Sequence, residues 1–262
     1  MLRNAFLRGL ISSTGYISGM ANPSVPLTDS NSLEPRPISS HRKGQRWFEV
    51  ALVMSVAFSG SLATSVFVLR NGPGAVTQLS SFRMLVGLIH EVTCLFLLGY
   101  VLSRQSRRFR DIGLTWSLRD VGVGLVVAVV SLASYWLGAV ALNIIHYAIF
   151  RSPVIDHSPK EIFGSVGVAV IPFILLNPFF EELIVRAYLM TEIMDLTGSA
   201  MLAIATSVLL QASYHLYYGW FGALSLSFQF LIFAIYYATR RRALPLIVAH
   251  GFFDLYGLIR LW

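Results

Sequence analysis

Two adjacent glutamates and an arginine interrupt an apolar stretch of the chain, NPFFEELIVRAYL, at residues 177–189. On a helix, Glu182 and Arg186 are four residues apart and share one face, whereas Glu181 is turned by about 100° from Glu182. Arg186 can therefore neutralise only Glu182 well. Glu181 would face a cavity, desolvated beside a second carboxylate, which makes it the candidate proton acceptor. The alternative is a structural ion pair near the membrane interface, with the spare glutamate reaching water.

Two histidines further along the chain could complete such a site. His215 lies in LLQASYHLYYGW, and His250 precedes Asp254 by four residues in HGFFD, so that His250 and Asp254 share a helical face. Asp254 could orient the imidazole or hold its charge. Taken singly, His215 could be a hydrogen-bonded residue among aromatics, and the His–Asp pair could link two helices. Together with Glu181, they are the groups that activate a water and stabilise an oxyanion in amide hydrolysis.

The elements that carry these residues are predicted to span a membrane. Of the 262 residues, 55% are hydrophobic and only 13% are charged, which does not suit a soluble globular protein. Apolar windows of about 20 residues, the length that crosses a bilayer, recur along the chain. They are residues 47–70, 82–103, 120–148, 163–190, 199–218, 220–239 and 243–261. We therefore predict an all-α, polytopic transmembrane helical bundle of seven spans, or of eight if Asn177-Pro178 divides the fourth.

The basic residues predict how these spans are oriented. They form three clusters, namely Arg42, Lys43 and Arg46; Arg104, Arg107, Arg108, Arg110 and Arg119; and Arg240, Arg241 and Arg242. Seven spans with a cytoplasmic N-terminus place all three clusters on the cytoplasmic side, where short loops retain Lys and Arg. The net charge of +7 is then a consequence of topology, and no nucleic-acid partner is expected.

Residues 1–46 are rich in Ser and Pro and are expected to form a disordered cytoplasmic tail. Their first part, with Arg3, Arg8 and no acid, also fits a transit peptide or an amphipathic anchor. Cys94, the single cysteine, lies within a span and excludes an intrachain disulfide. His90-Glu91 in the second span is expected to be an interhelical hydrogen-bond pair.

The order of these motifs resembles the CAAX-protease and bacteriocin-processing family of intramembrane proteases, which includes the type II prenyl-protein endopeptidase of the endoplasmic reticulum. The family signature is EExxxR, then FxxxH, then HxxxN or HxxxD. The resemblance covers roughly residues 107 to 260. It divides the chain into the tail, two N-terminal transmembrane helices over residues 47–106, and a protease core over residues 107–262.

The first and third motifs match in full and the second in part. Glu181, Glu182 and Arg186 supply the first, and His250 with Asp254 supplies the third. In the second motif the histidine is His215, but Gln211 stands where the family has an aromatic residue, and Tyr214 stands beside the histidine.

The resemblance implies a role for each matched residue. Glu181 with His215 would activate the hydrolytic water, and His250 with Asp254 would hold the oxyanion of the tetrahedral intermediate. Glu182 and Arg186 would be the structural pair. An aspartate at position 254 repels an oxyanion unless it is protonated or paired with an imidazolium.

Three further expectations concern chemistry, alternatives and location. Metal-free catalysis without a cofactor is predicted, because no HExxH is present; the alternative is a zinc site formed by Glu181, His215 and His250. The competing function is a non-enzymatic membrane protein, an immunity factor or a transporter, although a transporter would show paired repeats. The protease would be a multi-pass membrane protein, located in the plasma membrane if the source is bacterial. It would contact the lipid bilayer and a membrane-associated peptide or protein substrate, and this substrate could be prenylated or not.

Overall fold

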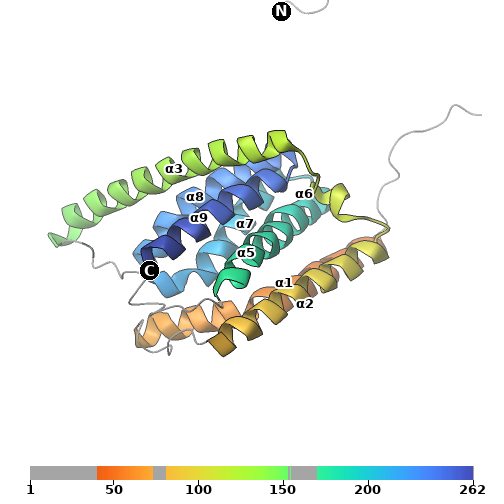
Figure 1. Ribbon diagram of the computed structural model, residues 1–262, viewed down its shortest axis with the longest axis horizontal. Coiled ribbons are helices and arrows are strands. Elements are labelled where there is room, and N and C mark those ends of the chain that lie inside the picture. Colours follow the sequence, from red (N-terminus) through yellow and green to blue (C-terminus); the bar gives the residue numbers. More distant parts are fainter. Residues whose placement is uncertain (1–39, 73–80, 153, 155–169, 262) are drawn as a thin grey trace, which may run out of the picture. The chain divides into compact units, whose positions relative to one another are not determined.

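The computed structural model describes residues 40–72, 81–152, 154 and 170–261 (Figure 1). Within these ranges the chain forms helices and no strand, which confirms the all-α prediction. Residues 1–39 of the expected tail and residues 163–169 of the fourth predicted span lie outside the described residues. Helix α1 begins at Ser40, so residues 40–46, expected in the tail, are helical.

The helices follow the apolar windows of the sequence. They are α1 (Ser40–Asn71), α2 (Ser81–Arg104), α3 (Leu118–Phe150), α5 (Val170–Glu181), η3 (Glu182–Met190), α6 (Thr191–Thr197), α7 (Ala200–Tyr214), α8 (Gly219–Arg240) and α9 (Leu244–Leu261), with short 3-10 turns η2 (Phe109–Ile112) and η4 (Leu216–Tyr218). By length and composition, α1, α2, α3 and α8 can each cross a membrane, whereas α7 and α9 are shorter apolar helices. A helical membrane bundle is confirmed, and the number of spans stays a prediction.

The described part of the fourth apolar segment is a continuous helix despite Pro178. Helix α5 passes through Pro178 and continues directly into η3, a π-helix, and then α6, so Asn177-Pro178 does not divide it, which was the alternative that would have given an eighth span. All nine residues of η3 are buried. Hydrogen bonds of the i to i+5 type widen the helix, and such segments occur often at functional sites. Gly198, with φ of 73°, ends α6, and Ser199 caps α7 through the Leu202 N–H.

Two groups of helices flank this segment (Figure 1). Helix α3 packs against α8 and α9, while α1 and α2 lie side by side, with α2 against α5 and α1 against α7. Glycines permit the close approach of α3: a Cβ at Gly124 would lie 2.7 Å from the Pro245 carbonyl oxygen, and one at Gly138 would overlap the Phe228 ring. Small residues at such interfaces are typical of membrane helices.

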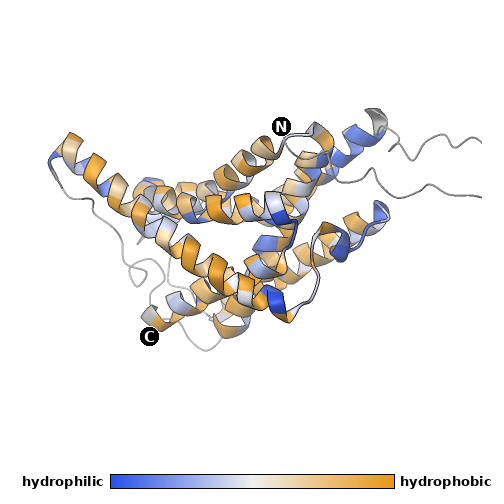
Figure 2. Ribbon diagram, turned by 90° about the horizontal axis from the view of Figure 1, so that it is seen from above, coloured by the Kyte–Doolittle hydropathy of each residue, from blue (hydrophilic) through white to orange (hydrophobic). Residues whose placement is uncertain are grey.

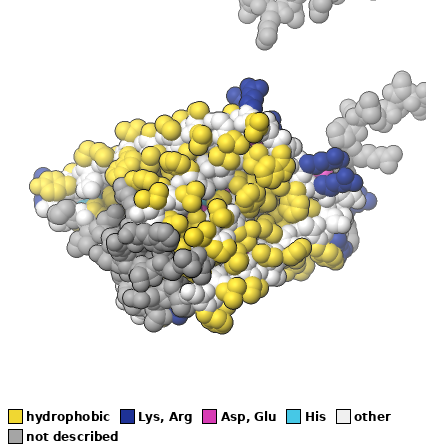
Figure 3. Space-filling model, viewed as in Figure 1, with side chains coloured by type: hydrophobic (Ala, Val, Ile, Leu, Met, Phe, Trp, Pro, Cys, Tyr) yellow, Lys and Arg dark blue, Asp and Glu magenta, His cyan; other side chains and the backbone are white. Residues whose placement is uncertain are grey.

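The outer surface of the bundle suits contact with lipid. Large apolar side chains stand exposed along the helices, among them Phe82, Phe96, Leu137 and Ile144. Figure 2 shows hydrophobic residues along the helices and hydrophilic residues gathered near their ends. In Figure 3 apolar side chains cover most of the visible face, and Lys and Arg lie at its margins. This distribution is the one expected where hydrocarbon replaces water around the spans.

The three basic clusters meet at one end of the bundle, around α6. Glu192 is fully buried and accepts hydrogen bonds from Arg46 at 2.6 Å and from Arg107 at 2.7 Å. Arg241, from the third cluster, donates to the Thr191 hydroxyl at 3.4 Å. The clusters therefore share one side of the molecule, as the topology prediction requires. Glu192 is a buried carboxylate whose charge is offset by one arginine from α1 and one from the connection that follows α2.

Candidate active site

The residues singled out in the sequence lie on three neighbouring segments. Glu181 ends α5 and Glu182 begins η3, while His215 follows the last residue of α7. His250 lies within α9, which packs against α5, and α7 packs against η3. Three segments that are separate in the sequence therefore bring their polar residues to one region of the bundle.

Glu181 is held by two side chains from α7. Its carboxylate oxygen Oε2 accepts a 2.6 Å hydrogen bond from the Tyr214 hydroxyl and a 3.3 Å hydrogen bond from the Gln211 amide. Glu181 itself is 8% exposed. Within the described residues both of its hydrogen bonds use Oε2, so that Oε1 remains available to a further donor.

Helix α1 fixes the position of Tyr214. The Tyr214 ring is stacked on Phe58, with centroids 4.7 Å apart and planes inclined by 7°, and the Ser65 hydroxyl donates a 2.5 Å hydrogen bond to the Tyr214 carbonyl. The position of the Glu181 carboxylate therefore depends on a helix that carries none of the predicted site residues.

Glu182 is fully buried and lies between a histidine and an arginine. Its Oε1 is 2.9 Å from Nδ1 of His250, and its Oε2 is 3.8 Å from Nε of Arg186. Arg186 is also fully buried; its guanidinium carbon is 5.8 Å from the ring centres of both Phe230 and Phe233. Arg186 is thus positioned by Glu182 and two aromatic rings, in the manner of a cation–π contact.

His250 connects Glu182 to a second carboxylate. Its Nε2 lies 3.5 Å from Oδ1 of Asp254, one helical turn further along α9. The other oxygen of Asp254 accepts a 3.2 Å hydrogen bond from the Asn177 amide. Both oxygens of Asp254 therefore face donors, and His250 is oriented by carboxylates on its two nitrogens.

His215 lies beside this group. Its Nδ1 is 2.9 Å from the Gln211 carbonyl oxygen, and its ring packs on Phe230 and Tyr218. Because a carbonyl only accepts, Nδ1 must carry a proton, which leaves Nε2 of the neutral ring as an acceptor. His215 and His250 both lie within electrostatic range of Glu181, although no direct hydrogen bond joins His215 to Glu181 in the described structure.

Comparison with known proteins identifies the segment that holds these residues. Residues 163–256 match the sequence model of the family described as type II CAAX prenyl endopeptidase Rce1-like. This segment is therefore similar to the CAAX-protease family. Comparisons with curated proteins and with solved structures found no match. The family segment is shorter than the residues 107 to 260 expected to resemble it; helices α1, α2 and α3 lie outside it.

Three polar residues near the CAAX-protease motifs were not predicted as part of the site. Gln211 occupies the position where the family motif has an aromatic residue, and it donates to Glu181. Tyr214 and Asn177 contact Glu181 and Asp254, respectively. The signal available in the sequence was the presence of polar groups in an apolar span next to the motif residues. Their partners depend on how α5, α7 and α9 approach one another.

Glu91 of α2 is a further acid close to the CAAX-protease motifs. It is 3% exposed, its Oε2 has no hydrogen-bond partner among the described residues, and it lies within electrostatic range of Glu181, His250 and Asp254. Its neighbour His90 does hydrogen-bond another helix, through the Ala57 carbonyl of α1 at 3.2 Å. Of the two residues expected to form interhelical hydrogen bonds, His90 therefore does so among the described residues, whereas Glu91 faces the residues of the CAAX-protease motifs.

The arrangement of the site does not fit a metal ion. In the described part of the chain, no three His, Cys, Asp or Glu side chains are grouped so that they could hold one. Of the alternative zinc ligands, His250 has a carboxylate near each ring nitrogen, so that both of its nitrogens are directed at acceptors within the protein. Zinc binding needs several ligands, each with a free lone pair, directed at one common point.

Proposed function

We propose that the protein is an intramembrane endopeptidase of the CAAX-protease type, which hydrolyses a peptide bond of a membrane-associated substrate with a water activated by Glu181. One observation carries this proposal. In a segment of the CAAX-protease family, the Glu181 carboxylate is buried and anchored through one oxygen, while its other oxygen is left to accept a proton. A carboxylate held in this way is preorganised for general base catalysis.

The water-activating step uses Glu181 and His215. Oε1 of Glu181 accepts a proton from the water, and Nε2 of His215 accepts a hydrogen bond that directs the water oxygen to the substrate carbonyl carbon. As the new C–O bond forms, the carbonyl π bond breaks and its electrons move to the carbonyl oxygen. Tyr214 and Gln211 hold Glu181 in place during this transfer.

The oxyanion is stabilised by donors on the opposite side of the site. When protonated, Nε2 of His250 is one such donor, and the Asn177 amide is another. Asp254 acts as a positioning residue that orients both, and its negative charge is offset by His250. With its charge offset in this way, Asp254 would not repel the oxyanion. The intermediate then collapses as the C–N bond breaks and Glu181 returns its proton to the departing amine.

Glu182 and Arg186 support the site without touching the substrate. Both are fully buried, and Glu182 fixes the Nδ1 side of His250. The pair therefore orients the imidazole, and its charges remain compensated inside the bundle.

Residues 107–262 would form the protease core, and residues 47–106 would form two further transmembrane helices. The basic end of the bundle and the N-terminus would lie on the cytoplasmic side.

The proposal is tested by capturing the substrate. The full chain, purified with the substitution Glu181→Gln, should retain a membrane-associated peptide or protein that the wild-type protein releases cleaved, as identified by mass spectrometry of the retained material. Cleavage at one peptide bond by the wild-type protein, and none by Glu181→Gln, supports the endopeptidase. Retention of the same molecule uncleaved by both would overturn it and favour a non-enzymatic binding protein.

A further inference from the structure

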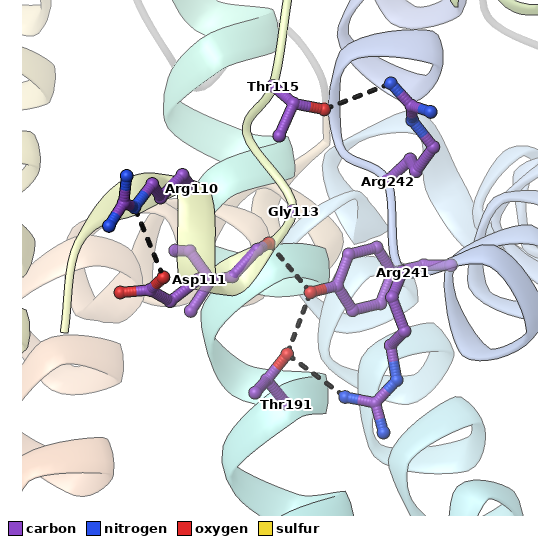
Figure 4. Close-up of a pocket in the computed structure, with 9 residues that line it drawn as sticks. Arg110, Asp111, Gly113, Thr115, Thr191, Arg241 and Arg242 are labelled. Atoms are coloured by element: carbon purple, nitrogen blue, oxygen red, sulfur yellow. Dashed lines mark hydrogen bonds and ion pairs between the residues drawn. The ribbon is translucent and has the colours of Figure 1, made fainter.

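A polar cavity of about 480 Å³ lies at the basic end of the bundle (Figure 4). Four segments line it: residues of the turn from Arg110 to Thr115, Thr191 at the start of α6, Tyr237 of α8, and the connection between α8 and α9 with Arg241 and Arg242. A cavity of this volume is large enough for a small ligand. Glu181 and His250 do not line it, so that the cavity is separate from the proposed active site.

The hydroxyl of Tyr237 holds one wall of the cavity in place. It lies 2.9 Å from the Ile112 carbonyl oxygen, 3.0 Å from the Ala187 carbonyl oxygen and 2.8 Å from the Thr191 hydroxyl. Tyr237 is 1% exposed. A single buried hydroxyl therefore joins α8 to η2, η3 and α6.

Gly113 joins the turn before α3 to the connection between α8 and α9. Its carbonyl accepts a 2.9 Å hydrogen bond from the Ala243 N–H, and its φ of 92° lies in the left-handed region. A Cβ at this position would overlap the carbonyl oxygen of Arg241. Only glycine allows this backbone conformation and this close approach together. The connection that carries Arg241 and Arg242 is thus fixed against the turn before α3.

The charges of the cavity are not balanced. Arg110 lies 3.6 Å from Asp111, and Arg242 pairs with Asp120 at 2.5 Å. Arg241 instead donates to the Thr191 hydroxyl at 3.4 Å, and within the described ranges no carboxylate lies at ion-pair distance from it. Figure 4 shows Arg241 and Thr191 directed toward one another on one side of the cavity. Among the described residues, the guanidinium of Arg241 in this cavity therefore has no counter-charge.

We infer that this cavity binds the phosphate group of an anionic ligand, with Arg241 as its main contact. A guanidinium presents paired N–H donors that match phosphate oxygens. Arg110 can supply further donors. The cavity lies at the end of the apolar helices, the level at which phospholipid headgroups occur if the bundle spans a bilayer. A lipid headgroup and a soluble phosphate ester share this chemistry.

Binding is measured on the purified full chain in detergent by native mass spectrometry and thermal unfolding. The probes are phosphatidic acid, phosphatidylglycerol, phosphatidylcholine with the same acyl chains, and soluble glycerol 3-phosphate. Phosphatidic acid should bind more tightly than phosphatidylcholine. Arg241→Gln and Arg110→Gln should each weaken its binding about fivefold, the effect of removing one arginine near a headgroup. Neither variant removes a buried ion pair, so that both should fold.

The matched control is Arg240→Gln, which removes an exposed charge of the same cluster outside the cavity. It should leave binding unchanged. Displacement of phosphatidic acid by glycerol 3-phosphate assigns the site to phosphate esters in general; failure to displace it, with lipid binding still dependent on Arg241, assigns it to a headgroup. Equal weakening by Arg240→Gln, or no effect of Arg241→Gln, overturns the inference. Protease activity does not enter these readouts, so failure of the proposed enzyme would be distinguishable.

Discussion

The hydroxyl of Tyr214 donates a 2.6 Å hydrogen bond to Oε2 of Glu181. This contact occupies the oxygen that does not meet the water in the proposed reaction, so it should position the general base rather than take part in bond making. The ring of Tyr214 is packed independently of its hydroxyl, through the stack on Phe58. The hydroxyl can therefore be removed with the aromatic packing intact.

We expect Tyr214→Phe to lower kcat about tenfold, the loss that corresponds to one hydrogen bond to a charged group. KM should change little, because the substrate does not contact the phenol. The matched control is Tyr188→Phe, since the buried Tyr188 hydroxyl has no hydrogen-bond partner among the described residues. Steady-state kinetics of both variants check this; an equal loss of activity in Tyr188→Phe would contradict it.

Loss of the Glu181 carboxylate should abolish activity, whereas loss of the Glu182 carboxylate should lower the stability of the fold. Glu181→Gln keeps a hydrogen-bonding side chain of the same size but removes the base, so cleavage should stop while the melting temperature stays near that of the wild type. Glu182→Gln leaves Arg186 buried without a carboxylate, a change that costs roughly 3–5 kcal/mol in comparable buried pairs. Thermal unfolding and cleavage assays on the purified proteins separate the two. A similar fall in melting temperature for both would return the pair to a structural role.

His215→Ala should lower turnover by roughly 10²–10⁴-fold, the contribution of a lost acid–base group. His215→Gln, which retains a polar side chain in the aromatic pocket, serves as the control for packing. Both variants should bind a substrate-derived peptide with nearly unchanged affinity. A proportionate rise in KM without a change in kcat would instead assign His215 to substrate binding.

Activity of the purified protein should survive strong chelation, and elemental analysis should find no stoichiometric metal. The reason is that His250 meets carboxylates at both nitrogens. In a zinc enzyme, removing the ion removes the activated water. Loss of activity with a chelator and recovery with zinc, at one ion per chain, would make Glu181, His215 and His250 ligands instead.

Cysteines placed at positions 42, 108 and 241 should react with an impermeant reagent from the same, cytoplasmic, side of the membrane. The background is Cys94→Ala, which removes the single native cysteine, a buried one. The contacts around Glu192 place the first two clusters close together, and α6 links them to the third. Labelling of 108 and 241 from opposite sides would show that the span assignment is wrong.

The helices could be located from the sequence because a bilayer requires long apolar runs. Such a run is a property of the segment itself and does not depend on which helices pack against it. The π-helix could not, since Glu182 to Met190 has no local signal that distinguishes i to i+5 bonding from the α-helix, and its geometry depends on the surrounding packing. The ion pair of Glu182 with Arg186 follows from spacing within one helix. The contacts of Tyr214 and Asn177 cross between helices, where spacing carries no information.

The buried acid Glu192 is separated from Arg46 by 146 positions and from Arg107 by 85. During synthesis the chain emerges from its N-terminus, so both arginines are made long before the carboxylate that neutralises them. Helix α2 can pack against α5 as soon as α5 has been translated, whereas the ion pairs of Arg46 and Arg107 with Glu192 can form only after α6 has followed. A ribosome stalled before residue 192 would therefore hold both arginines without the carboxylate that they share.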